Sequence, residues 1–282
     1  MAYIYLAGRP LSESHTTVIE GATAAVEHAT EQMSFRSHQK ESRRGKFRAT
    51  DSGVSSGTGN VRPHMLKMYS DQAPVLQELF QNKDMLRISA YVNSAFKGFA
   101  PDLHDLYRDE LKAVMDKDKS LRPPFLGSVF ACAAINFPPD VVAIPHRDHL
   151  NLAYGWCSIT PLGHFDHKVG AHLVLPELEL AIQFPVGSTI FIPSAAFTHY
   201  NTTFQEGETR SSITQFSAGG IFRWTAYGHQ LKREAEAACV QGKKWWEKGK
   251  GLDEFVSCLD SKLNCHWTND FLLLRKSRWP SG

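Results

Sequence analysis

The chain has 282 residues, a formal net charge of +2 and a hydrophobic content of 42%. A chain of this size buries one sizeable core, so we expect one main domain with appendages rather than two equal domains. The small net charge excludes attraction to nucleic acid through overall charge, so such binding would need a local patch. We expect no signal peptide and no membrane span, and the five cysteines, which lack Cys-x-x-Cys spacing, indicate reduced thiols inside a cell.

The first segment, residues 1–62, is expected to be a helix followed by a basic linker or arm. Apolar residues recur at helical spacing over 12–34, with Ser12 or Ser14 as a possible cap. Residues 36–48 are rich in Lys and Arg; they fit a solvated linker, and equally a phosphate-contacting arm or a nuclear import signal. Residues 52–60 are rich in Gly and Ser and predict a loop.

The next segment contains supporting elements. Helical patterns cover 73–81 and 100–115, and a short strand is predicted between them at 86–92. Residues 125–137 predict a buried strand that enters the core, and Asn136 near its end either faces the site or caps a turn.

Short alternating segments separated by Gly and Pro then follow each other closely. They predict strands at 155–160, 171–176, 178–184, 187–192 and 211–218. Many short strands of this kind indicate a sandwich or jelly roll. We therefore predict an α+β protein with a double-stranded β-helix, cupin-like core over 63–228, flanked by N-terminal and C-terminal helices.

The last segment, residues 229–282, is expected to be a helical extension packed on the core. Helices are predicted at 230–240 and 252–263. Its four tryptophans are more typical of packing than of base stacking: Trp245, Trp246, Trp267 and Trp279.

Two histidines and one carboxylate stand out between the predicted strands. His146 and Asp148 follow the apolar run 141–144 directly, and His199 lies in Phe-Thr-His-Tyr. This is the ligand set of a mononuclear Fe(II) centre that keeps three coordination positions open. Arg210 follows His199 closely, and a guanidinium can grip a carboxylate with two hydrogen bonds, as the distal end of 2-oxoglutarate requires.

A second His-x-Asp pair competes with the first. His164 and Asp166 have the same spacing but lie in a polar stretch that is typical of a hairpin loop. We prefer His146 and Asp148 because they follow an apolar strand. His199 alone would be an ordinary half-buried histidine and Arg210 alone a surface charge, so the specificity lies in the combination.

Several long motifs carry a family resemblance. The string from His146 to Cys157 reads His-Arg-Asp-His-Leu-Asn-Leu-Ala-Tyr-Gly-Trp-Cys, and further motifs span 170–178, 185–195 and 207–224. These motifs resemble the TET/JBP branch of the Fe(II)/2-oxoglutarate dioxygenases and are most similar to the set expanded in mushroom-forming fungi. The resemblance covers roughly residues 45–230.

The resemblance implies oxidation of 5-methylcytosine in DNA to its hydroxymethyl, formyl and carboxyl forms, with Fe(II), 2-oxoglutarate and O₂ as cofactor and co-substrates. It matches His146, Asp148 and His199 to the iron ligands and Arg210 to the 2-oxoglutarate arginine, with Ser212 as a second partner. It also implies a flipped base, with Asn151 and Phe216 as base contacts. A base-binding histidine of better-known relatives has no counterpart, because Ala218 stands there. Methylated DNA would be the partner of a nuclear protein that we expect to be a monomer.

Three alternatives stay open at this point. The missing histidine leaves room for N6-methyladenine, or both bases, as the substrate. The same chemistry could act on RNA or on a substrate that is not a nucleic acid. A non-catalytic DNA-binding relative is the third, and the complete set of iron ligands and arginine counts against it.

Overall fold

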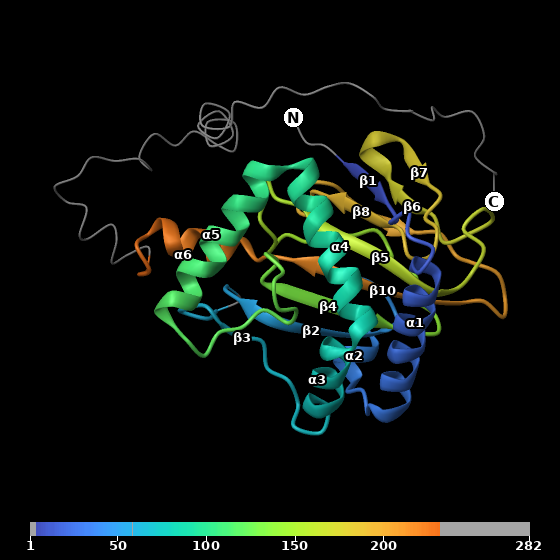
Figure 1. The fold of residues 1–282 in the computed structure, drawn as a ribbon, viewed down its shortest axis with the longest axis horizontal. Helices are drawn as coiled ribbons and strands as arrows, with labels where there is room; N and C mark the ends of the chain where they lie inside the picture. The colour runs from blue at the N-terminus through green and yellow to red at the C-terminus, as the bar shows by residue number, and fades with distance from the viewer. Residues whose placement is uncertain (1–3, 58, 232–282) are drawn as a thin grey trace.

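The structure is a computed structural model that describes residues 4–57 and 59–231, and it is built on two antiparallel sheets (Figure 1). The larger sheet has the strand order β1-β8-β5-β10-β4-β2-β3, and the smaller has the order β7-β6-β9. The strands of the larger sheet are β1 (Tyr5–Gly8), β2 (Arg48–Ser55), β3 (His64–Met65), β4 (Cys132–Phe137), β5 (Cys157–His164), β8 (Thr189–Ile192) and β10 (Thr209–Phe216). The smaller sheet contains β6 (Leu173–Leu175), β7 (Leu180–Ile182) and β9 (Tyr200–Asn201).

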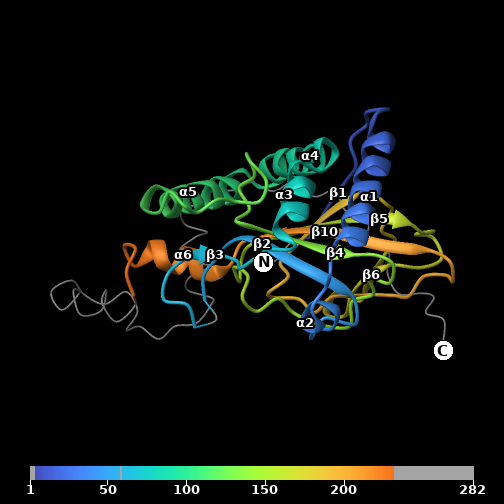
Figure 2. The ribbon, with the colours of Figure 1, turned by 90° about the horizontal axis from the view of Figure 1, so that it is seen from below.

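The two sheets face each other across an apolar layer. Figure 2 shows β6 on the side of the large sheet that is opposite to the main helices. The layer between the sheets takes side chains from β5, β6 and β8, and Phe216 of β10 packs against it; its buried members are Cys157, Ile159, Leu173, Phe184, Ile190 and Ile192. This arrangement is the predicted double-stranded β-helix, and the α+β fold class is confirmed.

Helices cover the other face of the large sheet (Figure 2). They are α1 (His15–Gln32), α3 (Ala73–Gln81), α4 (Lys83–Phe99) and α5 (Pro101–Lys117), while α2 (Ser37–Lys40) and α6 (Gly219–Ala226) lie outside this layer. The ring of Phe96 on α4 is fully buried and stacks on Phe130 and Phe191 at 5.1 and 5.6 Å between centroids. Alternate residues of each strand thus face either the helices or the second sheet.

One predicted strand is wrong. Residues 86–92 belong to α4, because Asn82 caps a helix there: its side chain accepts hydrogen bonds from the backbone N–H groups of Asp84 and Met85 at 2.9 and 3.3 Å. The buried residues of α4 also follow helical spacing and point to the sheet: Met85, Ile88, Ser89, Val92 and Phe96.

Other predicted boundaries need correction. The loop predicted at 52–60 begins later, because β2 continues to Ser55, where Gly53 adopts a positive φ beside the Ala131 carbonyl. The strand predicted at 125–137 starts only at Cys132. β5 continues to His164, and β1, β9 and α6 had no sequence prediction.

The N-terminal segment takes part in the central sheet. Residues 1–62 were expected to form a helix and a basic linker or arm, yet β1 pairs with β8 and β2 pairs with β4. The segment 36–48 is not a free linker, since Gln39 and Phe47 are buried and a tight turn joins Ser42 to Gly45, although Arg43 and Lys46 are exposed. The predicted helix over 12–34 is confirmed as α1, which begins after Ser14.

Part of the C-terminal prediction lies outside the described residues. The helix predicted at 252–263, the helix predicted at 230–240 apart from its first two residues, and all four tryptophans beyond residue 240 fall there. Within 4–57 and 59–231, no helix combines the length and the apolar character needed to span a bilayer.

Candidate metal centre

The three predicted ligands come from two loops at one end of the β-helix. His146 and Asp148 lie between β4 and β5, and His199 directly precedes β9. The backbone N–H groups of His146 and His199 each donate to the other residue's carbonyl, at 3.2 and 2.9 Å. The N–H of Asp148 donates to the Ser194 carbonyl at 2.9 Å. Main-chain bonds therefore hold the two loops together without help from the ligand side chains.

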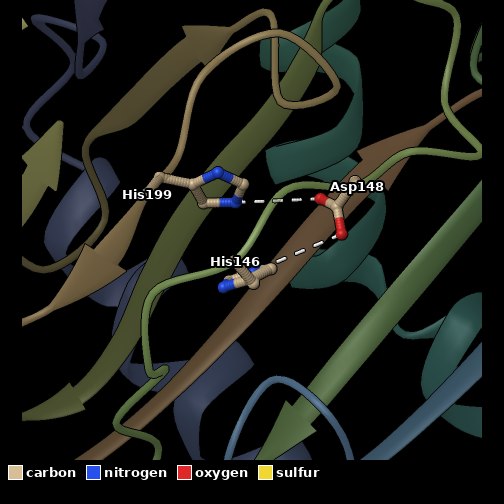
Figure 3. A group of neighbouring side chains, drawn as sticks. All are labelled: His146, Asp148 and His199. Carbon is tan, nitrogen blue, oxygen red and sulfur yellow. Dashed lines mark ion pairs between the residues drawn. The ribbon is translucent and has the colours of Figure 1, made fainter. Parts of the chain in front are cut away.

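The three side chains converge on one point (Figure 3). His146 Nε2 lies 4.0 Å from Asp148 Oδ1, and His199 Nε2 lies 3.7 Å from Asp148 Oδ2. All three donor atoms lie within 4.8 Å of one another. Donors placed at about 2.0–2.2 Å from a shared metal ion lie at most about 4.4 Å apart, so a small inward shift of these side chains would bring all three onto one ion.

Each imidazole is oriented by a backbone carbonyl. The Nδ1 atom of His146 lies 2.8 Å from the Ile144 oxygen, and that of His199 lies 3.2 Å from the Phe197 oxygen. A carbonyl oxygen only accepts, so each Nδ1 must carry the proton. Each Nε2 then presents its lone pair to the centre, which is the tautomer that a metal requires.

The protein also keeps these imidazoles neutral. Burial lowers the pKa of His146 to about 4, and the neighbouring His199 adds to the effect. Burial likewise lowers the pKa of His199, against the opposing influence of Asp148. Neutral imidazoles bind a metal without first losing a proton.

The competing pair does not form such a cluster. His164 is the exposed last residue of β5 rather than part of a hairpin loop, and its Nε2 lies 3.9 Å from Glu27 Oε1. Among the residues that the structure describes, one group of three His, Cys, Asp or Glu side chains has converging donor atoms, and it is His146, Asp148 and His199.

Arg210 on β10 is a buried cation with no carboxylate beside it. It exposes only 1% of its surface, and burial lowers its pKa to about 10. Its Nη1 donates to the Val141 carbonyl at 2.9 Å, while its buried Nε has no hydrogen-bond partner. No ion pair involves Arg210 within the described ranges. The guanidinium faces the Phe165 ring at 6.0 Å but has no counter-ion within the described residues, so a buried charge of this kind is costly.

Ser212 lies two residues after Arg210, on the same face of β10. Its Oγ accepts a hydrogen bond from Asn136 Nδ2 at 2.9 Å. The Ser212 hydroxyl proton therefore stays available for a further acceptor. Asn136 thus faces the site from β4 instead of capping a turn.

The two predicted base contacts lie at the same end of the fold. Asn151 follows Asp148 in a turn, and its Nδ2 donates to Ser194 Oγ at 2.9 Å. Phe216 ends β10 and packs on the apolar layer between the sheets. An isolated bridge between Asn151 and Ala218 ties the two segments together.

Two further residues beside the triad were not predicted. The guanidinium of Arg43 lies 3.6 Å from Asp148 Oδ1 and donates to the Arg147 carbonyl at 2.7 Å. Asp51 on β2 lies 3.8 Å from Arg44. The basic composition of residues 36–48 could have drawn attention to Arg43 and Arg44. Nothing in the sequence indicated that these arginines lie beside His146.

Comparisons with known proteins give weak similarity. No family model matches the chain, and no curated protein matches it. Among solved structures, NgTET1 in complex with 5mC DNA aligns with 12% identity and a TM-score of 0.45, covering 73% of this chain and 92% of that one.

Two further solved structures align over similar lengths. An oxidoreductase of the 2OG-Fe(II) oxygenase family from Burkholderia pseudomallei aligns with 15% identity and a TM-score of 0.37, covering 71% of this chain and 80% of its own. A Pseudomonas putida prolyl-4-hydroxylase aligns with 12% identity and a TM-score of 0.38, covering 76% and 90%. At such values, the assignment of the site rests on its own side chains.

Proposed function

We propose that the protein is an Fe(II)- and 2-oxoglutarate-dependent dioxygenase that oxidises the methyl group of 5-methylcytosine in DNA. The observation that carries the proposal is the combination of a converging His146, Asp148 and His199 triad with a buried arginine that lacks a counter-ion. The first part fits a divalent metal and the second fits a carboxylate. Together they match the two groups that such an oxygenase binds.

The triad fits Fe(II) in its donor chemistry. Two neutral imidazoles and one carboxylate on one side of a metal leave the opposite positions free for other ligands. Fe(II) bound there with 2-oxoglutarate and O₂ would supply the oxidation of an otherwise inert methyl group. The backbone carbonyls of Ile144 and Phe197 hold both imidazoles in the required orientation.

Arg210 would hold the distal carboxylate of 2-oxoglutarate. Its Nη1 is occupied by the Val141 carbonyl, so the edge that bears the unpartnered Nε is the one that a carboxylate would meet. Ser212 would add a hydrogen bond from its hydroxyl group. A fork of this type binds carboxylates with two parallel hydrogen bonds, which a lysine cannot reproduce.

The nucleic-acid part of the proposal rests on the resemblance of the motifs in 146–224. A base stacked in duplex DNA cannot reach a metal inside a β-helix, so the nucleotide would be flipped out. Phe216 would stack on the flipped base and Asn151 would contact its edge. Arg43 is exposed and lies beside Asp148, and Lys46 is exposed on the same turn as Arg43. Both side chains would contact backbone phosphates of the DNA. We further propose that the protein acts in the nucleus and as a monomer.

Mass spectrometry of nucleosides tests the proposal. Duplex oligonucleotides with 5-methylcytosine or N6-methyladenine are incubated with the protein, Fe(II), 2-oxoglutarate and ascorbate, beside Asp148→Ala as the metal-site control. The expected result is hydroxymethyl, formyl or carboxyl cytosine that disappears in the control. Loss of methyl from adenine alone would move the substrate to that base. If neither base reacts while Fe(II) and 2-oxoglutarate still bind, the DNA substrate is wrong and a different oxygenase substrate remains.

A further inference from the structure

Asp51 stands in a row of side chains that crosses the inner face of the large sheet. Strand register pairs Asp51 with Ala134, Ala134 with Thr214, Thr214 with Ile159, and Ile159 with Ile190. Side chains directly opposite each other on paired strands share one face. Ile159 and Ile190 belong to the layer between the sheets, so Asp51 also faces the interior of the β-helix.

The neighbouring rows place Asp51 between two predicted binding groups. The row on one side contains Ala49, Asn136 and Ser212, and the row on the other side contains Gly53, Cys132 and Phe216. Successive rows are about 7 Å apart, and β2 lies two strands, or roughly 10 Å, from β10. The Asp51 carboxylate therefore faces the space between the proposed 2-oxoglutarate site and the proposed stacking ring.

This carboxylate is accessible to solvent although the strand register turns it towards the second sheet. Its side chain keeps 40% of its surface accessible although it faces the inside of the fold. Burial raises its pKa, Arg44 opposes this effect, and the charge of Asp148 adds to it, as expected for an acid enclosed by protein near the metal ligands. A ligand that enters between the sheets at this end of β2 could therefore contact the Asp51 carboxylate.

Asp51 has one long ion pair and no hydrogen bond of its side chain within the described residues. No hydrogen bond reaches its side chain from the described residues, and the Arg44 guanidinium stays 3.8 Å away. By contrast, the carboxylate of Asp71 accepts two hydrogen bonds of 2.7 Å from the Arg36 guanidinium, as expected for an ion pair that stabilises the fold. The acceptor atoms of the Asp51 carboxylate are therefore not occupied by hydrogen bonds within the described residues and can accept one from a ligand.

We propose that Asp51 determines substrate specificity by accepting a hydrogen bond from the exocyclic amino group of the target base. The inference rests on the proposed function and extends it to a choice between bases. A carboxylate accepts hydrogen bonds and cannot donate them. Cytosine offers an N4 amino donor, whereas thymine, which carries the same C5 methyl group, offers the O4 acceptor instead. Asp51 thus favours 5-methylcytosine and repels thymine.

The test compares oxidation of 5-methylcytosine and thymine at one position of the same oligonucleotide, measured as the ratio of kcat/KM values. We expect wild type to prefer 5-methylcytosine and Asp51→Asn, which adds a donor at constant shape, to reduce that ratio by at least about tenfold. Asp51→Ala removes the group altogether and should reduce the ratio as well. Asp109→Asn changes an exposed carboxylate on α5 and should keep the wild-type ratio.

Each outcome decides between the two proposals. A wild-type enzyme that oxidises thymine as fast as 5-methylcytosine overturns the role of Asp51 and leaves the dioxygenase proposal intact, whether or not the variants fold. Folded and active Asp51 variants with the wild-type ratio also overturn it. Anaerobic absorption of the Fe(II) complex with 2-oxoglutarate checks the metal site separately. If that complex forms and wild type oxidises neither base, the proposed substrate fails and the Asp51 inference fails with it.

Discussion

The backbones of His146 and His199 hydrogen-bond to each other in both directions, with N–H to O distances of 3.2 and 2.9 Å. The two imidazole ligands are thus positioned by main-chain contacts that do not involve their ring atoms. A preformed site of this kind loses less conformational freedom when the ion binds. Because these hydrogen bonds use only backbone atoms, a ligand side chain can be replaced without removing the contacts that fold the two loops.

His199→Ala should therefore abolish metal binding without unfolding the protein. The backbone bonds remain, while one donor atom is lost, so Co(II) affinity should fall by more than the ~100-fold that loss of an outer partner can cost. Absorption titration with Co(II) and circular dichroism measure the two effects. His149→Ala is the matched control, since that exposed histidine lies outside the triad. Unchanged Co(II) binding by His199→Ala would contradict the site.

The two lowered histidine pKa values predict how the metal-free protein responds to acid. The folded pKa of His146 is about 4 and that of His199 is also lowered, whereas unfolded histidine titrates near 6.5. Below 6.5 the unfolded chain takes up protons that the folded site refuses, so stability falls as the pH drops from about 6.5 to about 4. Urea unfolding of the metal-free protein across this range should show a shallower pH slope for His146→Ala than for wild type. Equal slopes would mean that the imidazoles are not held neutral.

Arg210→Met should separate ligand binding from stability. The buried guanidinium lacks a carboxylate partner, so its replacement by an apolar side chain of similar length should leave the Tm of the ligand-free protein unchanged or raise it. The Tm increase that 2-oxoglutarate gives to wild type should disappear, because ligand stabilisation requires binding to the folded state. Differential scanning fluorimetry measures both. Arg223→Met, at an exposed position of α6, should keep the ligand response.

Gly53→Ala should destabilise the fold more than Gly57→Ala. Both glycines adopt positive φ, at 114° and 118°. A Cβ at Gly53 would collide with the Ala131 carbonyl, whereas a Cβ at Gly57 would meet nothing within 4 Å. Both substitutions place alanine at a positive φ, which costs roughly 1–3 kcal/mol in each variant. The difference between the two unfolding free energies therefore measures the steric clash at Gly53 alone. We expect this difference to be at least about 1 kcal/mol. Chemical denaturation measures it, and equal costs would mean that β2 can move away from β4.

Residues 86–92 show where local sequence pattern was insufficient. The stretch is apolar and short enough to be either a strand or part of a helix, and periodicity alone cannot separate these. Its state is decided by Asn82, which lies outside the stretch and caps α4, and by Phe96, which continues the buried face. The helix at 73–81 carried its own signals, including Pro74 in its first turn, and was predicted with the observed bounds.

The candidate site shows a similar division. His146, Asp148 and His199 could be predicted because residue type and spacing are local features, although residues 141–144, expected to be a strand, lie in the loop between β4 and β5. Asp51 could not, because its inward direction depends on pairing with β4, which is far away in the sequence. The loop predicted at 52–60 also concealed the alternation of β2, in which Thr50, Ser52 and Val54 are buried and Asp51 is accessible. The direction of the Asp51 side chain thus follows from strand pairing between distant segments, which the local sequence pattern does not reveal.

The place of β1 and β2 at opposite parts of the large sheet constrains how the chain folds as it is synthesised. The partner of β2 is β4, and β1 pairs with β8, which ends at Ile192. β1 must therefore wait for β8 until Ile192 has been made, and β2 must wait for β4 until Phe137 has been made. Such late, non-local pairing slows folding and leaves nascent chains open to aggregation, so we expect chaperone dependence during expression.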